Sequence, residues 1–422
     1  MVDEHHLNSL HYLDTVIKEA QRLHPVAPLL IPHESTQGCT IEGFHIPKQS
    51  RILVNVWAIG RDPDVWPDPE KYSPERFIGS EIDLRGHDFQ LLPFGSGWRS
   101  CPGLQLEANG RQYPNPTPKN MAWIWTLLML FLAYHLLRKL LGGVGPNNYP
   151  PGPIPLPILG HFHLLGKNPH QDLCHLARKY GPVLGLRFGF TPTVVVSSPA
   201  WAERVLKTHD LVFASRPTSN ACKHISYGQR NLTFAPYGPY WRDIRKLCTL
   251  ELLSNLRISR SQGMRRAELG LLVASLKRAA EGREVVDLSA RVSGLSADMN
   301  CLLVLGRKYE DRELDEKGFK ALFMETMELA ARFNLADYFP YVDALDLQGM
   351  GRRMKELSKI YDEFLEEIIK QHLEKKKCEG ENKREDIVDT MLSIMESGEA
   401  GFEFDQRHIK AVLLIGSLKT KY

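Results

Sequence analysis

A nearly uninterrupted apolar run at residues 121–137 lies inside the chain rather than at its start. At about 1.5 Å per helical residue it covers roughly 25 Å, slightly less than a bilayer core of about 30 Å. Two further leucines extend it if Arg138 and Lys139 snorkel. We therefore expect a transmembrane anchor over residues 121–141, with a buried core helix or a signal peptide as the alternative. An anchor here would divide the chain into two flanks.

The flank before the run has the pattern of a small mixed structure. Residues 9–23 place apolar side chains at helical spacing, which predicts a short buried helix that ends before Pro25. Residues 26–56 alternate apolar stretches with turns and predict a small antiparallel sheet. Residues 108–120 have neither periodicity nor apolar content, so we interpret them as a linker.

The flank after the run starts with a proline cluster inside residues 142–160, which predicts a stiff hinge. Two apolar stretches that follow predict a β-hairpin, and a helix should begin at Pro199. Beyond Trp241 the pattern is almost entirely helical. The chain is therefore expected to be mainly α, with a small β-sheet domain.

Composition excludes two classes of function. The 53 basic and 50 acidic residues are scattered rather than gathered in a stripe, so no nucleic-acid partner is expected. The seven cysteines are odd in number, widely spaced and without a CxxC pair, which excludes a disulfide framework and a zinc cluster.

One cysteine lies in a glycine-rich loop, PFGSGWRSCPG at residues 93–103. Gly97 and Gly103 permit tight turns, Arg99 supplies a fixed cation near the thiol of Cys101, and Phe94 can cover it. A thiolate held in this way is a metal ligand. A lone cysteine in such a loop is more often structural, but the full spacing Phe-x-x-Gly-x-Arg-x-Cys-x-Gly favours the ligand.

This spacing resembles the cysteine loop of the cytochrome P450 superfamily of haem-thiolate monooxygenases, and in particular the membrane-anchored plant microsomal type. The resemblance implies haem b as the cofactor, with Cys101 as the ligand of its iron. It also implies that Phe94, Gly97, Arg99 and Gly103 surround the cofactor. No residue of this chain is assigned a catalytic role.

Two charged motifs agree with this resemblance. Glu19 and Arg22 lie three residues apart on one helix face, which alone is an ordinary surface ion pair. Together with Arg76, in the Pro-Glu-Arg-Phe sequence at residues 74–77, they match the family's Glu-x-x-Arg and Pro-Glu-Arg-Phe motifs. The resemblance implies a buried charge network that braces the cysteine loop, with a structural role.

A third motif, Trp241 and Arg245, lies in the second flank. Their spacing of four residues places the indole N–H and the guanidinium on one side of a helix, where both can address one anion. Alone, such a pair is more often an amphipathic helix surface. The resemblance implies that the anion is a haem propionate, and that Arg99 reaches a propionate as well.

The order of these parts departs from the family, in which the anchor comes first and the cysteine loop near the end. We therefore expect a permuted and incomplete chain, and no residue matches the threonine of the central helix that handles dioxygen and protons. The expected segments are a carboxy-terminal-type haem-thiolate block (1–107), the linker (108–120), the anchor (121–141), the hinge (142–160), an amino-terminal-type block (161–416) and a non-homologous tail (417–422).

Two functions are compatible with these motifs. By resemblance, the chain is a monooxygenase that inserts one oxygen atom from O2 into an apolar plant metabolite, with electrons from NADPH-cytochrome reductase. Residues 27–30 and 215–230 would then line the substrate pocket. The alternative is an inactive membrane protein from a fused or incomplete gene, at best a haem binder.

The anchor also predicts a location, a single pass through the endoplasmic reticulum membrane with the main body in the cytosol. The flanks of a spanning segment lie on opposite sides of the membrane. We therefore expect that a copy of the chain whose apolar run spans the membrane cannot assemble one haem site from both flanks.

Overall fold

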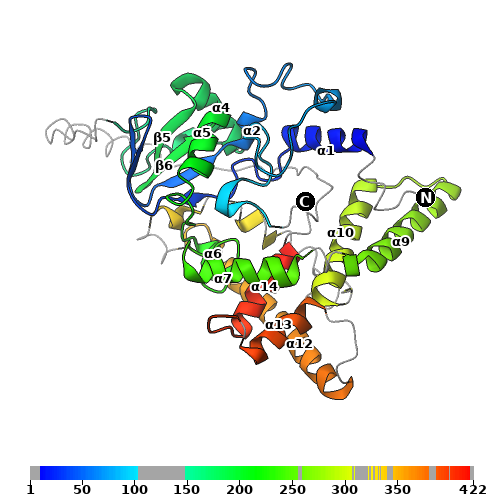
Figure 1. Cartoon of the computed structure of the whole chain (residues 1–422). Coiled ribbons are helices and arrows are strands. Elements are labelled where there is room, and N and C mark those ends of the chain that lie inside the picture. The colour runs from blue at the N-terminus through cyan, green and yellow to red at the C-terminus, as the bar shows by residue number, and fades with distance from the viewer. Residues whose placement is uncertain are drawn as a thin grey trace. The chain divides into compact units, whose positions relative to one another are not determined.

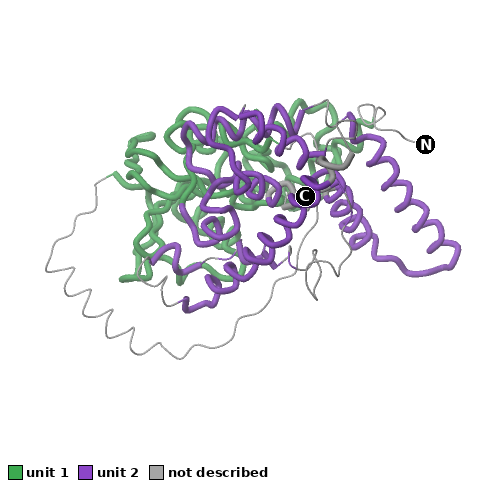
Figure 2. Tube along the Cα trace, turned by 90° about the horizontal axis from the view of Figure 1, so that it is seen from below, with its two compact units in different colours: residues 1–217 green, residues 218–422 purple. Residues whose placement is uncertain are grey.

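The structure of the protein is a computed structural model with two compact units, residues 1–217 and 218–422 (Figure 2). The fold is mainly helical with a small mixed sheet, which confirms the predicted fold class. The residues that the structure describes are 10–102, 148–254, 259–306, 308, 322, 325–326, 328–330, 332, 334–339, 346–379, 386–398 and 400–418.

The first unit contains helices α1, α2, α4 and α5, short helical turns and all six strands described (Figure 1). Helix α1 ends just before His24 and Pro25, as the apolar spacing and the proline predict. The elements of this unit are α1 (His11–Leu23), β1 (His33–Glu34), β2 (Cys39–Ile41), β3 (Phe44–Ile46), β4 (Arg51–Val54), α2 (Val56–Ile59), η2 (Pro74–Phe77), η3 (Gly97–Arg99), η5 (Phe162–Leu164), α4 (Pro169–Tyr180), β5 (Val183–Phe188), β6 (Thr191–Val196), α5 (Pro199–Glu203) and η6 (Arg204–Thr208).

A four-stranded sheet in the order β1-β4-β6-β5 forms the centre of this unit. The predicted hairpin is confirmed, since β5 and β6 pair antiparallel. The predicted antiparallel pairing within residues 26–56 is present between β1 and β4, but β4 also pairs in parallel with β6 from the other flank, which the sequence did not predict. The physical reason is that all four residues of β4 are buried, as in a central strand covered on both faces. Only β2 and β3 form a separate antiparallel pair.

The core of the first unit draws on both flanks of the apolar run. Ile52 and Val54 of β4 are packed in one cluster with Val194 and Val196 of β6 and with Phe213. Each of these side chains is at most 1% exposed. The sheet and its core therefore depend on residues from both sides of the run.

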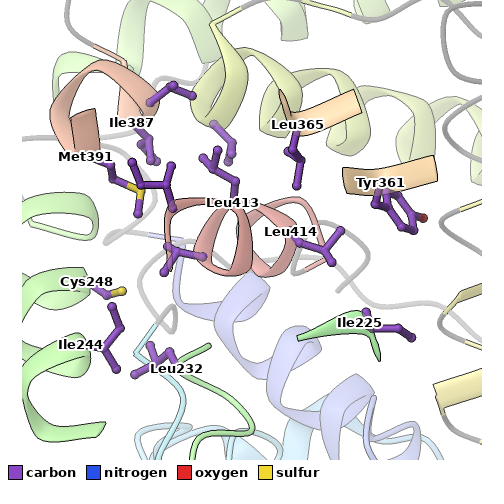
Figure 3. Packing of buried hydrophobic residues seen from close by; sticks show 14 of the residues in the cluster. Ile225, Leu232, Ile244, Cys248, Tyr361, Leu365, Ile387, Met391, Leu413 and Leu414 are labelled. Atoms are coloured by element: carbon purple, nitrogen blue, oxygen red, sulfur yellow. The ribbon is translucent and has the colours of Figure 1, made fainter. Parts of the chain in front are cut away.

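The second unit is helical, and α10, α12 and α13 pack against α14. Figure 3 shows Leu413 and Leu414 of α14 among side chains of α7, α12 and α13. The apolar stripe predicted along residues 352–376 is buried here as core packing. The elements are α6 (Asn220–Ile225), α7 (Pro239–Leu247), η7 (Cys248–Leu252), α9 (Gln262–Glu281), α10 (Leu288–Leu305), η8 (Leu335–Asp337), α12 (Met350–Glu379), α13 (Ile387–Ser397) and α14 (Gln406–Leu418).

The compact units do not coincide with the segments expected from the sequence, because the block 1–107 shares its unit with residues 148–217. The expected linker and anchor lie outside the described residues, and the hinge is described only from residue 148. Among the helices that are described, none is long and apolar enough to cross a membrane. Helix α14 extends to Leu418, into the expected tail.

Candidate functional site

The cysteine loop is built on two left-handed glycines. Gly95 and Gly97 have φ of 70° and 67°, a region that side chains with a Cβ rarely adopt. The loop closes on itself, because the Cys101 N–H donates to the carbonyl of Phe94 at 3.0 Å. The Cys101 side chain is half-buried rather than enclosed in the core. Gly103 lies outside the described residues.

Gly97 also brings the loop against the other flank. A Cβ at this position would lie 2.0 Å from the carbonyl oxygen of Leu206, which is closer than any real contact. Leu206 belongs to η6, a π-helical segment, and such segments are frequent at functional sites. The loop that presents the cysteine therefore rests directly on backbone from after the apolar run.

Arg99 is fixed by the same segment of chain. Its Nε donates to the Ala214 carbonyl at 2.6 Å. Ser96 also holds the loop, because its hydroxyl donates to the Gly86 carbonyl at 2.6 Å. Arg99 lines a small cavity together with His33, Ser96, Trp98, Val205, Leu206, Asp210 and Ala214.

His33 is a member of this cavity that the sequence did not indicate. Its Nδ1 donates to the Phe213 carbonyl at 2.8 Å, so Nε2 is the ring's acceptor in the neutral form. Burial lowers the pKa of His33 well below 6.5, and the charges of Arg216 and Arg99 lower it further, against the hydrogen bond to Phe213. The cavity therefore combines the guanidinium of Arg99 and a neutral imidazole with the carboxylate of Asp210, and the charge of Arg216 acts on the imidazole as well.

No local pattern marks His33 or Arg216 in the sequence. Arg216 donates from Nη1 to the carbonyls of Ile31 and Pro32, at 2.6 and 2.9 Å. These bonds join positions 185 and 184 residues apart in the chain, so only the folded chain brings Arg216 and His33 to Arg99.

The predicted charge network of Glu19, Arg22 and Arg76 is present as a buried cluster. Arg22 donates to both carboxylate oxygens of Glu19, at 2.7 and 2.8 Å, and both side chains are fully buried. Arg76 donates to Glu19 at 3.2 Å, and the Ser73 N–H does so at 2.8 Å. Burial raises the pKa of Glu19, but the hydrogen bonds and charges of these partners outweigh it and lower the pKa.

The remaining donors of this network join α1 to the turn-rich segment that follows β4. Arg22 also donates to the carbonyls of Gly60, Pro69 and Lys71. Arg76 donates to the carbonyls of Pro67, Asp68 and Lys71. The network therefore locks α1 against residues 60–76. The role that the resemblance implies, bracing of the cysteine loop, stays a prediction, because these hydrogen bonds do not reach that loop.

Trp241 and Arg245 lie together on α7, in the second unit. Trp241 is 1% exposed, and its indole N–H donates to the Leu232 carbonyl at 3.1 Å. The guanidinium of Arg245 lies 5.4 Å from the centre of the Trp241 ring. The expectation that both side chains address one anion does not match this indole, whose N–H is directed to a backbone carbonyl.

The substrate-pocket segments expected from the resemblance fall in different places. Residues 27–30 are half-buried between α1 and β1. Residues 215–230 are divided between the two compact units and include α6.

A second cluster with metal-ligand chemistry, His372 with Asp386 and Asp389, is a helix cap. Asp386 accepts the Asp389 N–H at 2.9 Å at the start of α13, and it lies 2.8 Å from His372 Nε2. His372 Nδ1 donates to the Ile368 carbonyl at 2.8 Å. These partners already satisfy the cluster without an ion.

The sequence profile of the family described as Cytochrome P450 matches residues 2–107 and 150–416, which is most of the chain. The chain belongs to the cytochrome P450 family. Both matched segments contain motifs identified above, with the cysteine loop in the first and α7 in the second. Members of this family bind haem b, so the family match supports the expected cofactor.

Plant proteins are among the relatives. Cytochrome P450 CYP736A12 of Panax ginseng is 44% identical over 68% of this chain and 59% of its own length. The 4-hydroxyphenylacetaldehyde oxime monooxygenase of Sorghum bicolor is 38% identical over 70% of this chain and 58% of its own. The flavonoid 3'-monooxygenase CYP75B137 of Crocosmia x crocosmiiflora is 37% identical over 69% and 57%. The chain thus spans less than two thirds of these relatives.

The chemistry of the first unit fits a haem in two respects. The half-buried thiol of Cys101 is accessible to an iron atom, and the backbone of Leu206 supports the loop at Gly97. The guanidinium of Arg99, in a cavity that also contains His33 and Asp210, can pair with a propionate carboxylate. We therefore regard the donor set of this unit as compatible with the cofactor of the family.

Proposed function

We propose that the chain is a haem-thiolate monooxygenase that inserts one oxygen atom of O2 into an apolar small molecule. A plant secondary metabolite is the proposed substrate class, because relatives include a flavonoid monooxygenase and an oxime monooxygenase by name. NADPH-cytochrome reductase is the proposed source of electrons. The observation that carries the proposal is Cys101, half-buried at the end of a loop fixed by Gly97 and Arg99.

Each residue has a separate role in this proposal. Cys101, as thiolate, would hold the iron, and haem bound in this way supplies the activation of dioxygen. Phe94, Gly97 and Gly103 would shape the loop around the thiolate, and Arg99 would hold a propionate. By resemblance, Arg245 would hold a propionate as well. The indole N–H of Trp241 donates to Leu232, so Trp241 would act only by packing its ring against the guanidinium of Arg245.

His33 adds a proton-coupled element to the propionate contact. Burial, aided by the positive charges of Arg216 and Arg99, lowers the pKa of this imidazole and favours its neutral form. A carboxylate placed among these groups would offset the two positive charges and raise the pKa of His33. Binding of the carboxylate is therefore expected to be accompanied by some proton uptake at this side chain.

A second candidate function is haem binding without oxygen insertion. The sequence of α14 favours it, since residues 406–418 contain no threonine to match the family's residue for dioxygen and proton handling. The two candidates share Cys101 as the ligand and differ only in turnover.

The reduced, haem-loaded full chain tests both candidates through its carbon monoxide difference spectrum. We expect the strongly red-shifted band of a cysteinate-ligated haem, retained in Cys39→Ser and lost in Cys101→Ser. Cys39 is a matched control because it is also half-buried, and burial raises the pKa of its thiol. Equal loss in both variants would contradict the assignment. NADPH consumption with reductase and apolar substrates then separates the monooxygenase from the haem binder.

We also propose that the protein acts at the endoplasmic reticulum membrane, with its main body in the cytosol. The apolar run at residues 121–137 and the basic pair at its end support this location. We further propose that the carboxy-terminal part of the family precedes its amino-terminal part here, from the positions of the cysteine loop and the apolar run. Fluorescence microscopy of a tagged chain tests the location.

A further inference from the structure

Strands from opposite sides of the apolar run lie next to one another in one sheet. The parallel pairing of β4 with β6 extends from Arg51 beside Thr193 to Val54 beside Val196. It continues beyond the strand, where the Asn55 N–H donates to the Val196 carbonyl at 2.8 Å. Neighbouring strands are about 4.8 Å apart, so this ladder holds both flanks within one strand spacing.

A second backbone connection joins the flanks on the far side of β1. The Glu34 N–H donates to the Ser215 carbonyl at 3.0 Å, and the Thr36 N–H donates to the Val212 carbonyl at 2.8 Å. These bonds satisfy backbone groups that would otherwise be left in a buried environment. Two separate stretches of the first flank are therefore hydrogen-bonded to the second.

The apolar core makes the same connection. Ile52 of β4 and Phe213 are each completely buried in one cluster with Val194 of β6. The cluster takes side chains from both flanks, so separation of the flanks would expose apolar surface to water. The first unit is thus one folding unit made from both flanks.

A single membrane crossing between the flanks is incompatible with this geometry. A spanning helix places its two ends about 30 Å apart, on opposite faces of the bilayer. The sheet requires backbone from either side of the run to lie about 4.8 Å apart. Moreover, a hydrogen-bonded ladder cannot cross the hydrocarbon core as an open sheet.

We propose that residues 10–102 and 148–217 of one molecule fold together as the first unit and lie in the same compartment. The net number of membrane crossings between residues 102 and 148 is then even. This differs from the single crossing that the apolar run by itself predicts. It also puts Cys101 on the same side as the η6 segment that supports its loop. The proposal does not depend on haem binding.

The Glu42 and Arg204 ion pair provides a reporter for this arrangement. One residue comes from each flank, and Arg204 Nε lies 2.9 Å from Glu42 Oε1. Their side chains are 55% and 35% exposed, so cysteines at these positions are open to reagents. An exposed ion pair of this kind contributes little to stability, and the fold should tolerate its loss.

The experiment uses the full chain in sealed microsomes, as Glu42→Cys, as Arg204→Cys and as the double variant. Labelling by a membrane-impermeant maleimide is measured before and after permeabilisation, with the parent chain as the background from its own cysteines. We expect the two single variants to respond alike. In the double variant, a short bis-maleimide should cross-link the two positions within one molecule and increase its mobility on a denaturing gel, which neither single variant should do.

Three results would overturn the proposal. One is labelling of one position before permeabilisation and of the other only afterwards. Another is a cross-link that joins two molecules, because β4 and β6 would then come from different copies. The third is no cross-link in the double variant either before or after permeabilisation, because the sheet that joins the flanks would not have formed.

Discussion

Replacement of Arg22 by methionine removes the largest single set of hydrogen bonds in the buried charge network. Methionine retains an unbranched side chain that can fill much of the same space. Five hydrogen bonds are lost, two to the carboxylate of Glu19 and three to the backbone carbonyls of Gly60, Pro69 and Lys71.

The expected cost follows from what remains behind. The Glu19 side chain is 0% exposed, so its charge loses its main partner without gaining water. Breaking a buried ion pair by removing one partner costs about 3–5 kcal/mol. Glu19 keeps the Ser73 N–H and Arg76, which reduces the cost, while the three carbonyls left behind increase it. We expect a loss of about 4 kcal/mol, or about a thousand-fold in a local opening equilibrium.

Hydrogen exchange over α1, read by mass spectrometry, measures this loss in the segment where it arises. Arg204→Met is the matched control, because the same substitution there breaks an ion pair whose carboxylate partner is 55% exposed. It should cost about 1 kcal/mol or less in the free energy of opening.

A double variant tests the mechanism of the loss. Adding Glu19→Gln to Arg22→Met removes the unpaired buried charge, so the two costs should not add and should differ from their sum by about 1–3 kcal/mol. If Arg22→Met and Arg204→Met accelerated exchange over α1 equally, the buried network would not stabilise the fold as argued.

Two further perturbations test the loop and the second unit. Gly97→Ala should lower the temperature of thermal unfolding of the first unit clearly more than Gly79→Ala. Both glycines have positive φ, but only a Cβ at Gly97 would meet a carbonyl oxygen, that of Leu206. Equal changes in the unfolding temperature would contradict this contact. Burial lowers the pKa of His372, but its hydrogen bond to Asp386, that residue's charge and the neighbouring groups outweigh burial and raise it above 6.5. Its contribution to stability is therefore complete below about pH 6.5 and is lost as the pH rises through the raised pKa. His372→Gln should flatten the pH dependence of the free energy of urea unfolding. An unchanged pH dependence would contradict the contact with Asp386.

The elements that could be predicted from the sequence are those whose cause is local. Helix α1 follows from apolar spacing and from Pro25, and the β5–β6 hairpin follows from two adjacent apolar stretches. The spacing around Cys101 likewise requires a tight loop, and Gly95 and Gly97 adopt the positive φ that it needs.

The parts that could not be predicted depend on distant contacts. Nothing in the four residues of β4 indicates that its second neighbour, on the side away from β1, is β6 from the other flank. His33 joins Arg99 only because the chain around Phe213 lies beside β1. The spacing of Trp241 gives its helix face, but the partner of its indole is set by the loop that contains Leu232.

The identity of the iron ligand is the claim on which the proposed function depends, and X-ray absorption at the iron edge measures it directly. The haem-loaded full chain is expected to show one sulfur neighbour at the iron, retained in Cys39→Ser and replaced by a lighter atom in Cys101→Ser. A parent chain whose iron has only nitrogen and oxygen neighbours, or a sulfur neighbour that persists in Cys101→Ser, would contradict the account.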